Sequence, residues 1–255
     1  MIKVRGLTKS LGGNIILNQL DLDVQSGEIF AVMGSSGAGK SVFLKHLIGL
    51  FRPDSGTIEI DNQNITRLKE KELLKLRKDM GYLFQEGALY DFMTVFDNVA
   101  FPLREHTRLN YDAVAGRVHD VLKMVDLENV EKKFPAELSG GMKKRVGLAR
   151  AIIMGAKILF CDEPTSGLDP IRSRDISDLI RQIAKKINST TVITSHDIEN
   201  VFRIADRMAI LEEGKILALG TKDELLKSTN AFVQEFLLKH IHNGMGCFWA
   251  GASFA

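Results

Sequence analysis

The sequence predicts an α/β fold built on a mainly parallel sheet, and three observations support this prediction. First, the apolar runs 29–33, 158–161 and 191–194 have the length of buried strands, and helical patterns separate them. Second, residues 1–27 alternate apolar and polar side chains, as strands of an antiparallel sheet do. Third, no strand-like alternation occurs from 86 to about 150, which predicts a helical insertion there. A chain of 255 residues is long enough to bury such a core.

The N-terminal region is predicted to be an antiparallel β subdomain. Leu20, Leu22 and Val24 alternate with polar residues, which is the period of a half-buried strand. The segment 12–14, Gly-Gly-Asn, favours a hairpin. The segment 57–60 alternates in the same way and is followed by an Asp-Asn turn. The predicted antiparallel strands therefore come both before and after the first parallel strand, 29–33, in the sequence.

A glycine-rich loop follows that first buried strand and leads into a helical pattern at 42–48. Strand, loop and helix in this order are the context that a G-x-x-x-x-G-K-[ST] match requires. The glycines let backbone N–H groups form a nest around phosphates, and the helix adds the positive end of its dipole. Lys40 can reach the terminal phosphates, and Ser41 can offer its hydroxyl to Mg²⁺. The loop residues are Gly34, Ser35, Ser36, Gly37, Ala38, Gly39, Lys40 and Ser41.

The remaining elements are predicted from periodicity and from turn and cap signals. Helices are expected at 67–78 and 176–187, and a short strand is expected at 81–84. A hairpin is expected around 208–217. A Thr-x-x-Glu capping box at 221–224 predicts the start of a further helix.

Composition and charge exclude several classes of protein. The net charge of +2 is too balanced to indicate nucleic acid by itself, and two cysteines make no disulfide framework. No apolar run reaches the ~18 residues that span a bilayer, and the N-terminus lacks the apolar segment of a signal peptide. We therefore expect a soluble chain in a reducing cytosol that can dock on a membrane component. Residues 243–255 fit no pattern, and both a disordered end and docking on a partner are open interpretations.

Polar groups that phosphate chemistry uses follow three of the buried strands. The first strand ends at the glycine loop, the second at Asp162 and Glu163, and the third at His196. Ligands of parallel α/β sheets lie beyond the carboxyl ends of the strands, so these groups are expected at one edge. Asp162 suits a carboxylate near Mg²⁺, and Glu163 can orient and polarise an attacking water. His196 can hydrogen-bond the terminal phosphate or the groups around the acid.

The segment 138–142, Leu-Ser-Gly-Gly-Met, begins a helix whose first turn is poorly suited to stability. Ser139 is a good N-cap, but Gly140 and Gly141 each destabilise a helix by about 1 kcal/mol relative to alanine. The positive charges at 143–145 lie near the positive end of the helix dipole, which is unfavourable. Such a start indicates an anion site. Because the chain already has a phosphate loop, the simplest prediction is a nucleotide held by a second copy of the chain.

Together these motifs resemble the ATPase subunit of an ABC transporter, and the resemblance covers residues 1–240. It implies a P-loop NTPase fold in which a helical subdomain at about 86–150 is inserted in the α/β core, with 241–255 as a tail. It also implies that two chains pair head to tail. Each ATP would then lie between the phosphate loop of one chain and the signature segment 138–142 of the other.

The resemblance also assigns roles to individual residues, with Glu163 as the catalytic base and with ATP and Mg²⁺ as cofactors. The residues that it assigns to catalysis are Glu163, His196, Lys40 and Gln85. Besides the glycine loop, the residues that it assigns to the nucleotide are Leu11, Ser139, Gly140, Gly141 and Asp169. Those that it assigns to the Mg²⁺ environment are Ser41, Gln85 and Asp162.

Two residues depart from the family pattern. The signature usually ends in glutamine, and Met142 stands there instead, so a polar side chain beside the composite site is lost. Leu11 stands where an aromatic residue commonly stacks on adenine, a contact worth about 1–3 kcal/mol per base. Since Leu11 supplies apolar contact only, we expect relaxed selectivity between ATP and GTP.

The segment 84–107 shows a narrower resemblance, to the ATPases of Mla-type lipid transporters, which work with MCE-domain proteins. Met142 is similar to that group as well. The resemblance implies integral-membrane permease subunits, an MCE-type lipid-binding protein and a small STAS-type subunit as partners, with no nucleic acid. It places the chain at the cytoplasmic side of the inner membrane, with 85–99 against the permease. An apolar cluster there would either grip a partner helix or form subdomain core, and it consists of Tyr90, Phe92, Met93 and Phe96.

The sequence therefore predicts the ATP-hydrolysing subunit of an ABC transporter that powers lipid movement. An importer ATPase for a small solute such as an amino acid is the main alternative, and the segment 86–107 argues against it. A non-transport ABC module would usually carry paired cassettes, long coiled-coil insertions or zinc-binding cysteines. A metabolic kinase would not explain the segment 138–142 or the aspartate loop at 166–169.

Overall fold

The computed structural model describes residues 1–241, with side chains to residue 238, and contains two sheets. The antiparallel sheet has the strand order β2–β1–β4–β5. Its strands are β1 (Ile2–Leu11), β2 (Asn14–Val24), β4 (Ser55–Ile60) and β5 (Gln63–Asn64). β1 and β2 pair as a hairpin in which Leu11 lies opposite Asn14. The predicted N-terminal antiparallel region is therefore confirmed.

The six-stranded sheet has the strand order β10–β9–β3–β8–β7–β6. β9, β3, β8, β7 and β6 pair in parallel along this order, whereas β10 runs antiparallel to β9. Because the parallel strands run the same way, their carboxyl ends meet at one edge, as the sequence predicts. The strands are β3 (Ile29–Met33), β6 (Met80–Leu83), β7 (Ile158–Asp162), β8 (Thr190–Ser195), β9 (Arg207–Glu212) and β10 (Lys215–Gly220).

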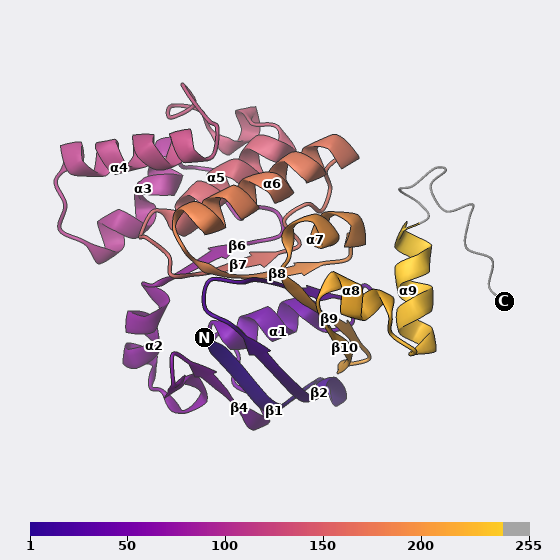
Figure 1. Cartoon of the computed structure of the whole chain (residues 1–255). Coiled ribbons are helices and arrows are strands. Elements are labelled where there is room, and N and C mark those ends of the chain that lie inside the picture. Colours follow the sequence, from indigo (N-terminus) through magenta and orange to yellow (C-terminus); the bar gives the residue numbers. More distant parts are fainter. Residues whose placement is uncertain (242–255) are drawn as a thin grey trace.

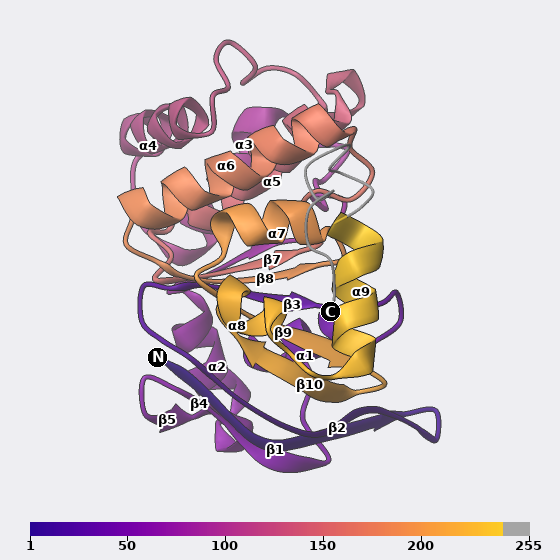
Figure 2. The same ribbon diagram turned by 45° about the vertical axis from the view of Figure 1, so that its right-hand side comes forward.

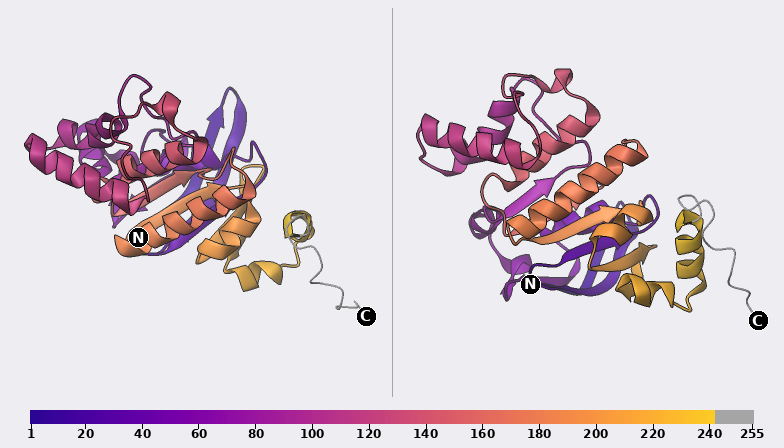
Figure 3. Two further views of the ribbon diagram at one scale, coloured as in Figure 1. Left: turned by 90° about the horizontal axis from the view of Figure 1, so that it is seen from above. Right: turned by 45° about the horizontal axis from the view of Figure 1, so that its top comes forward.

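Helices cover both faces of the six-stranded sheet (Figure 1). α1 (Lys40–Leu47) lies between the two sheets, and α5 (Gly140–Ile152), α6 (Pro170–Lys186) and α7 (Ile198–Ile204) lie on the opposite face (Figure 2). α3 (Val95–His106) and α4 (Tyr111–Met124) extend on the side away from α9 (Ala231–Ile241) (Figure 3). The remaining elements are α2 (Glu70–Arg77), α8 (Lys222–Leu226) and the 3-10 turns η1 (Ile65–Arg67) and η2 (Pro135–Glu137).

Two hydrophobic cores hold these layers together. In the first, Phe43, Leu44 and Leu47 of α1 pack between the antiparallel sheet and the six-stranded sheet. The second joins the other face of the six-stranded sheet to α3, α4, α5 and α6, and it includes Leu159 and Cys161 of β7. Cys161 is fully buried, as predicted for a small core residue. α1 is therefore enclosed on both sides, which fixes the helix that follows the glycine loop.

Two helices begin at residues that the apolar period does not predict. α2 begins at Glu70 because residues 65–67 form a 3-10 turn before it. α6 begins at Pro170, well before the apolar period on which the prediction rests. Asp169 caps this helix, since its Oδ1 accepts a hydrogen bond from the N–H of Arg172 at 3.0 Å. Proline also suits the first turn of a helix, so a cap and a proline determine this start.

The C-terminal part of the described chain packs on β3 and β9. Val233, Phe236 and Leu237 of α9 join a third hydrophobic cluster with α7 and α8. The capping box at 221–224 starts α8 as predicted. Among residues 1–241 no helix combines the length and the apolar composition that crossing a bilayer requires. The segment 243–255, for which two interpretations are open, lies outside the described residues.

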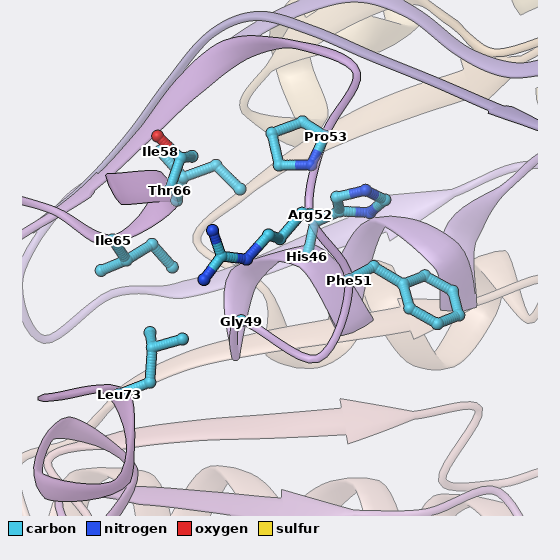
Figure 4. A pocket seen from close by; sticks show the side chains of 9 residues that line it. All are labelled: His46, Gly49, Phe51, Arg52, Pro53, Ile58, Ile65, Thr66 and Leu73. Atoms are coloured by element: carbon cyan, nitrogen blue, oxygen red, sulfur yellow. The ribbon is translucent and has the colours of Figure 1, made fainter. Parts of the chain in front are cut away.

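His46 on α1 is a fully buried histidine beside a small cavity. Its Nδ1 lies 2.8 Å from the carbonyl oxygen of Val42, which assigns the ring proton to Nδ1. Its Nε2 has no hydrogen-bond partner within the described part of the chain. The cavity has a volume of about 10 Å³ and is lined in part by Phe51, Arg52 and Ile58 (Figure 4). Burial lowers the pKa of His46, against the opposing effect of the Val42 carbonyl.

The free energy of unfolding should decrease in weak acid because of the buried His46 ring. In the unfolded chain a histidine titrates near about pH 6.5, whereas the folded protein holds His46 neutral to lower pH. As pH falls below about 6.5, protons therefore bind the unfolded chain preferentially, and the free energy of unfolding decreases. Urea unfolding at several pH values should show a shallower decrease for His46→Gln than for the parent. His119→Gln, whose side chain is 67% exposed, is the matched control and should keep the parent slope. Equal slopes for His46→Gln and the parent would contradict this assignment.

Candidate functional site

The glycine loop between β3 and α1 lies against two other stretches of backbone. A Cβ atom at Gly34 would lie 2.0 Å from the carbonyl oxygen of Leu211, so only glycine fits there. Gly39 has a φ of +102°, and a Cβ atom on it would lie 2.9 Å from the carbonyl oxygen of Ile16. α1 begins directly afterwards at Lys40, and the first N–H groups of a helix lack partners within it. The loop and the helix start can therefore hold phosphate groups.

Lys40 is buried within this loop, with 7% of its surface exposed. Its ammonium donates to the carbonyl oxygens of Gly34 at 2.8 Å and of Ser35 at 3.0 Å. It also forms an ion pair with Glu163 Oε1 at 3.2 Å. A positive charge is therefore fixed between the glycine loop and the end of β7.

Asp162, the last residue of β7, is 6% exposed and accepts hydrogen bonds from three hydroxyl groups. Ser41 and Thr194 each donate to its Oδ1 at 2.8 Å. Tyr82 donates to its Oδ2 at 3.1 Å. Burial disfavours a charged carboxylate unless such donors compensate for the lost water. Ser41 and Asp162, two of the three residues predicted for the Mg²⁺ environment, are therefore in direct contact.

Glu163 follows directly, and its backbone has a φ of +45°. This left-handed conformation costs a non-glycine residue about 1–2 kcal/mol, and such strain concentrates at functional sites. The carboxylate lies between two groups, with Oε1 3.2 Å from Lys40 Nζ and Oε2 2.8 Å from His196 Nδ1. Since a carboxylate only accepts, the ring proton of His196 is on Nδ1. The three predicted strand ends therefore meet at one edge of the sheet.

Other predicted residues lie around this centre and contact neighbouring loops. Gln85 Nε2 donates to Ser166 Oγ at 3.3 Å, in the loop before α6, so its contact with Mg²⁺ stays a prediction. Asp169 caps α6, and the N–H of Arg172 holds the pKa of its carboxyl below the usual value. Leu11 lies at the end of β1 and is 40% exposed.

The signature segment starts α5 as predicted. Ser139 Oγ accepts a hydrogen bond from the N–H of Met142 at 3.3 Å, which confirms the cap. A Cβ atom on Gly140 would lie 3.6 Å from Leu168, which belongs to the loop before α6. A Cβ atom on Gly141 would lie 4.0 Å from the Arg172 side chain. This helix start borders another loop of its own chain, and its contact with a nucleotide stays a prediction about a second copy.

Two of the three positive charges near the start of α5 have partners within the chain. Lys144 is 4% exposed and donates to the backbone carbonyl oxygens of Gln85 and, at 3.5 Å, of Glu163. Burial lowers the pKa of Lys144. Arg145 pairs with Asp126 at 2.8 Å. These cations are compensated by partners in their own chain, so the argument for an anion site rests on the glycines and the cap.

A comparison with protein families matches residues 17–166 to the model described as ABC transporter. The matched stretch contains the glycine loop, Gln85, the signature segment, Asp162 and Glu163. The chain belongs to the ABC transporter family. It is an ATPase that hydrolyses ATP for transport.

Named relatives of this ABC transporter chain carry different substrates in their names. "Probable ribonucleotide transport ATP-binding protein mkl" of Mycobacterium leprae is 45% identical over 92% of the chain, which spans 68% of that relative. "Intermembrane phospholipid transport system ATP-binding protein MlaF" of Haemophilus influenzae is 43% identical over 93% of the chain and 90% of its own length. "Methionine import ATP-binding protein MetN" of Campylobacter jejuni is 40% identical over 93% of the chain and 75% of its own length.

A solved ABC cassette has the same architecture. MJ0796, in a dimeric post-hydrolysis structure bound to ADP and Pi, matches with a TM-score of 0.80 at 31% identity. The match covers 87% of this chain and 98% of the MJ0796 chain. The predicted fold, with an antiparallel N-terminal sheet, a mainly parallel core sheet and helices, is therefore confirmed.

The donors at this site suit Mg²⁺. Within residues 1–241 no group of three or more His, Cys, Asp or Glu side chains could hold a metal by itself. Mg²⁺ is usually bound through one or two carboxylates together with substrate phosphates and water. Ser41 and Asp162 supply oxygen atoms only, and Ser41 Oγ lies 2.8 Å from Asp162 Oδ1 beside the phosphate loop. These two residues therefore fit that pattern.

Two residues of the site are not singled out by the sequence patterns. Thr194 and Tyr82 are predicted only as parts of short strands, yet both donate to Asp162. A signal exists in the run 190–194, Thr-Thr-Val-Ile-Thr, because hydroxyl groups in a fully buried strand need hydrogen-bond partners. Nothing comparable marks Tyr82, since aromatic residues are common in strands.

Replacing Thr194 with valine should destabilise the protein by about 1.5–3 kcal/mol. Valine keeps the shape but removes a hydroxyl that donates to a buried carboxylate, and hydrogen bonds to charged groups are worth about that much. Thr191→Val on the same strand is the matched control, because its hydroxyl contacts the neutral Ser189 hydroxyl at 3.2 Å. We expect a loss of about 0.5–1.5 kcal/mol there. Denaturant unfolding measures both, and equal losses would show that the charge of Asp162 has no special weight.

Proposed function

We propose that the chain hydrolyses ATP to move phospholipid in an Mla-type system at the cytoplasmic side of the inner membrane. Its partners would be integral-membrane permease subunits, an MCE-type lipid-binding protein and a small STAS-type subunit. The observation that carries hydrolysis is the position of Glu163 between Lys40 and His196. Lipid as the cargo is supported by the 43% identity to MlaF over 90% of that relative and by the segment 84–107.

The chemistry follows from these contacts. The terminal phosphates of ATP in the glycine loop compete with Glu163 for the ammonium of Lys40, because both are anions. Glu163 keeps its contact with His196 and can orient the attacking water with the oxygen that Lys40 releases. Ser41 and Asp162 would hold Mg²⁺, which would supply positive charge to the phosphate oxygens. Lys40 and the start of α1 stabilise the charge on the transferred phosphoryl group.

We propose that two copies pair head to tail around two ATP molecules. The first turn of α5 carries no side chain at Gly140 and Gly141, so its N–H groups are accessible to an anion. The Ser139 cap leaves the N–H groups of those two glycines free for phosphate oxygens, since it binds the N–H of Met142. The MJ0796 cassette, which is dimeric in a structure bound to ADP and Pi, supports the pairing of two copies.

The proposed permease contact is a groove of about 450 Å³ beside β6 and α3. Its aromatic lining consists of Tyr82, Phe84, Tyr90 and Phe101. The rings of Tyr90 and Phe101 lie 5.2 Å apart. An amphipathic helix from a membrane subunit could lay its apolar face in such a groove.

The predicted aromatic cluster is divided between this groove and the helical core. Tyr90 lines the groove and contacts Phe92, which is 76% exposed. Phe96 faces α4 instead, with its ring 5.9 Å from that of Tyr111, and packs on the core. Met93 is half-buried. We therefore propose that Tyr90 and Phe92 contact the partner helix, whereas Phe96 belongs to the subdomain core.

We also propose that residues 1–240 form one ABC ATPase domain with the helical subdomain 86–150 inserted in it. The core shared by α3, α4, α5, α6 and the sheet supports this division. Met142 packs on that core, which agrees with the loss of a polar side chain at the composite site. Leu11 would touch the nucleotide base through apolar contact only, which supports relaxed base selectivity.

Import of a small solute is the second candidate function. The 40% identity to MetN over 93% of the chain favours it, and mkl carries a third substrate in its name. The ATP site and the groove would serve either cargo, because the cargo is bound by the membrane subunits.

The proposal about cargo is tested by native purification from detergent-solubilised membranes with mass spectrometry of proteins and lipids. We expect permease and MCE-type subunits with bound phospholipid. A periplasmic amino-acid-binding protein in place of the MCE subunit would support the importer, and bound nucleic acid without membrane subunits would reject both.

Glu163→Gln should lower ATP turnover by about 10²–10⁴-fold, the usual contribution of a general base. Glutamine keeps an oxygen for Lys40 but cannot take a proton from water, so ATP should remain bound and hold a dimer. Phosphate release and size-exclusion chromatography with ATP measure the two effects. Glu128→Gln, on an exposed loop, is the control. Undiminished turnover in Glu163→Gln would reject its role as base.

Ser139→Arg should abolish hydrolysis in the membrane assembly while ATP still binds. Arginine would fill the space at the start of α5 that the partner's nucleotide needs, whereas the chain's own Lys40 site is unchanged. Ser139→Thr keeps a capping hydroxyl and should retain most activity. Phosphate release and nucleotide binding should be measured in parallel. A folded Ser139→Arg chain that hydrolyses ATP at the parent rate would reject the shared site.

A further inference from the structure

Tyr82 is a partly buried side chain of the site for which the proposed chemistry has no role. It lies on β6 opposite Phe160 of β7, and Asp162 is two residues further along that strand. Side chains two residues apart share one face of a strand, so Tyr82 and Asp162 lie on the same side of the sheet. The phenol oxygen lies 3.1 Å from Asp162 Oδ2. Tyr82 therefore reaches diagonally from β6 to the carboxylate on the neighbouring strand β7.

The two oxygens of Asp162 have different donors. Oδ1 accepts from Ser41 and Thr194, which belong to the glycine-loop helix and to β8. Oδ2 accepts from Tyr82, which belongs to β6. A carboxylate held from both sides cannot rotate about its Cβ–Cγ bond without losing a hydrogen bond. Tyr82 thus fixes the plane of the carboxylate that Ser41 contacts.

The phenol of Tyr82 is well suited to donate. Burial raises its pKa above the ordinary value, and the negative charge of Asp162 raises it further. Since a carboxylate only accepts hydrogen bonds, the phenol hydroxyl is the donor in its contact with Oδ2.

The ring of Tyr82 also belongs to the groove proposed for the permease. Tyr82 and Phe84 both line that groove, and their ring centroids lie 4.4 Å apart. Phe84 is 38% exposed, so a helix seated in the groove would touch its ring directly. One side chain therefore has its ring in the groove and its hydroxyl on Asp162.

We propose that Tyr82 is a positioning residue that makes the orientation of Asp162 toward Mg²⁺ depend on contact in the groove. The dependence on a membrane-subunit helix in the groove rests on the proposed function. A helix that packs on Phe84 presses on the Tyr82 ring and holds the phenol against Oδ2. The affinity of the site for Mg²⁺ then depends on whether the membrane subunit is bound in the groove.

The hydroxyl is tested with Tyr82→Phe in the full chain. The readout is binding of a fluorescent ATP analogue during a Mg²⁺ titration, compared with binding in EDTA. We expect the apparent Mg²⁺ affinity to fall about tenfold, since groups behind a metal ligand typically change affinity by 10–100-fold. Binding without Mg²⁺ should not change. Tyr111→Phe removes the hydroxyl of a tyrosine that is 69% exposed and should match the parent in both measurements. A Mg²⁺ titration of Tyr82→Phe that coincides with the parent overturns the positioning role.

The groove is tested by comparing the same titration in the isolated chain and in the purified membrane assembly. We expect the parent to bind Mg²⁺–nucleotide more tightly in the assembly and Tyr82→Phe to lose that gain. An equal gain in Mg²⁺–nucleotide affinity for the parent and for Tyr82→Phe overturns the coupling between the groove and the site. If the proposed function were wrong, the result would differ, because no membrane subunits would co-purify with the chain. The Mg²⁺ affinity of the isolated chain would still depend on Tyr82.

Discussion

The need to compensate two adjacent buried carboxylates at the end of β7 for lost water is the constraint on which the site depends. Asp162 is compensated by three hydroxyls, and Glu163 by Lys40 and His196. β7 lies between β6 and β8, so donors can reach it from both neighbouring strands. Neither carboxylate would be tolerated in this place without them. The order of the strands therefore decides which side chains can meet the phosphates.

The start of α5 is linked to the same centre through Lys144. This buried amine lies between the backbone of Gln85 and that of Glu163, while the first turn of its helix is proposed to meet the nucleotide of a second copy. A helix that touches both sites cannot move without shifting the loop that carries Gln85. In the proposed dimer the two ATP sites are thus mechanically joined inside each chain.

Most of the fold and the centre of the site follow from local sequence signals, whereas contacts between distant segments do not. The glycine loop and the strand ends are predictable because Asp162 directly follows an apolar run and His196 directly follows the strand that ends at Ser195. The start of α6 depends on an aspartate cap that an apolar period does not show. Lys144 resembles a surface charge in sequence, and its burial becomes visible only when β6, β7 and α5 pack together. Tyr82 looks like any strand aromatic for the same reason.

The enclosure of α1 between two sheets has a consequence for nucleotide exchange. A loop anchored to a helix with apolar neighbours on both sides has few alternative shapes, so little ordering entropy opposes ligand capture. Such a preformed cradle does not need to refold between turnovers. In the proposed dimer, the lifetime of a bound nucleotide would then depend on how fast the two copies that enclose it separate.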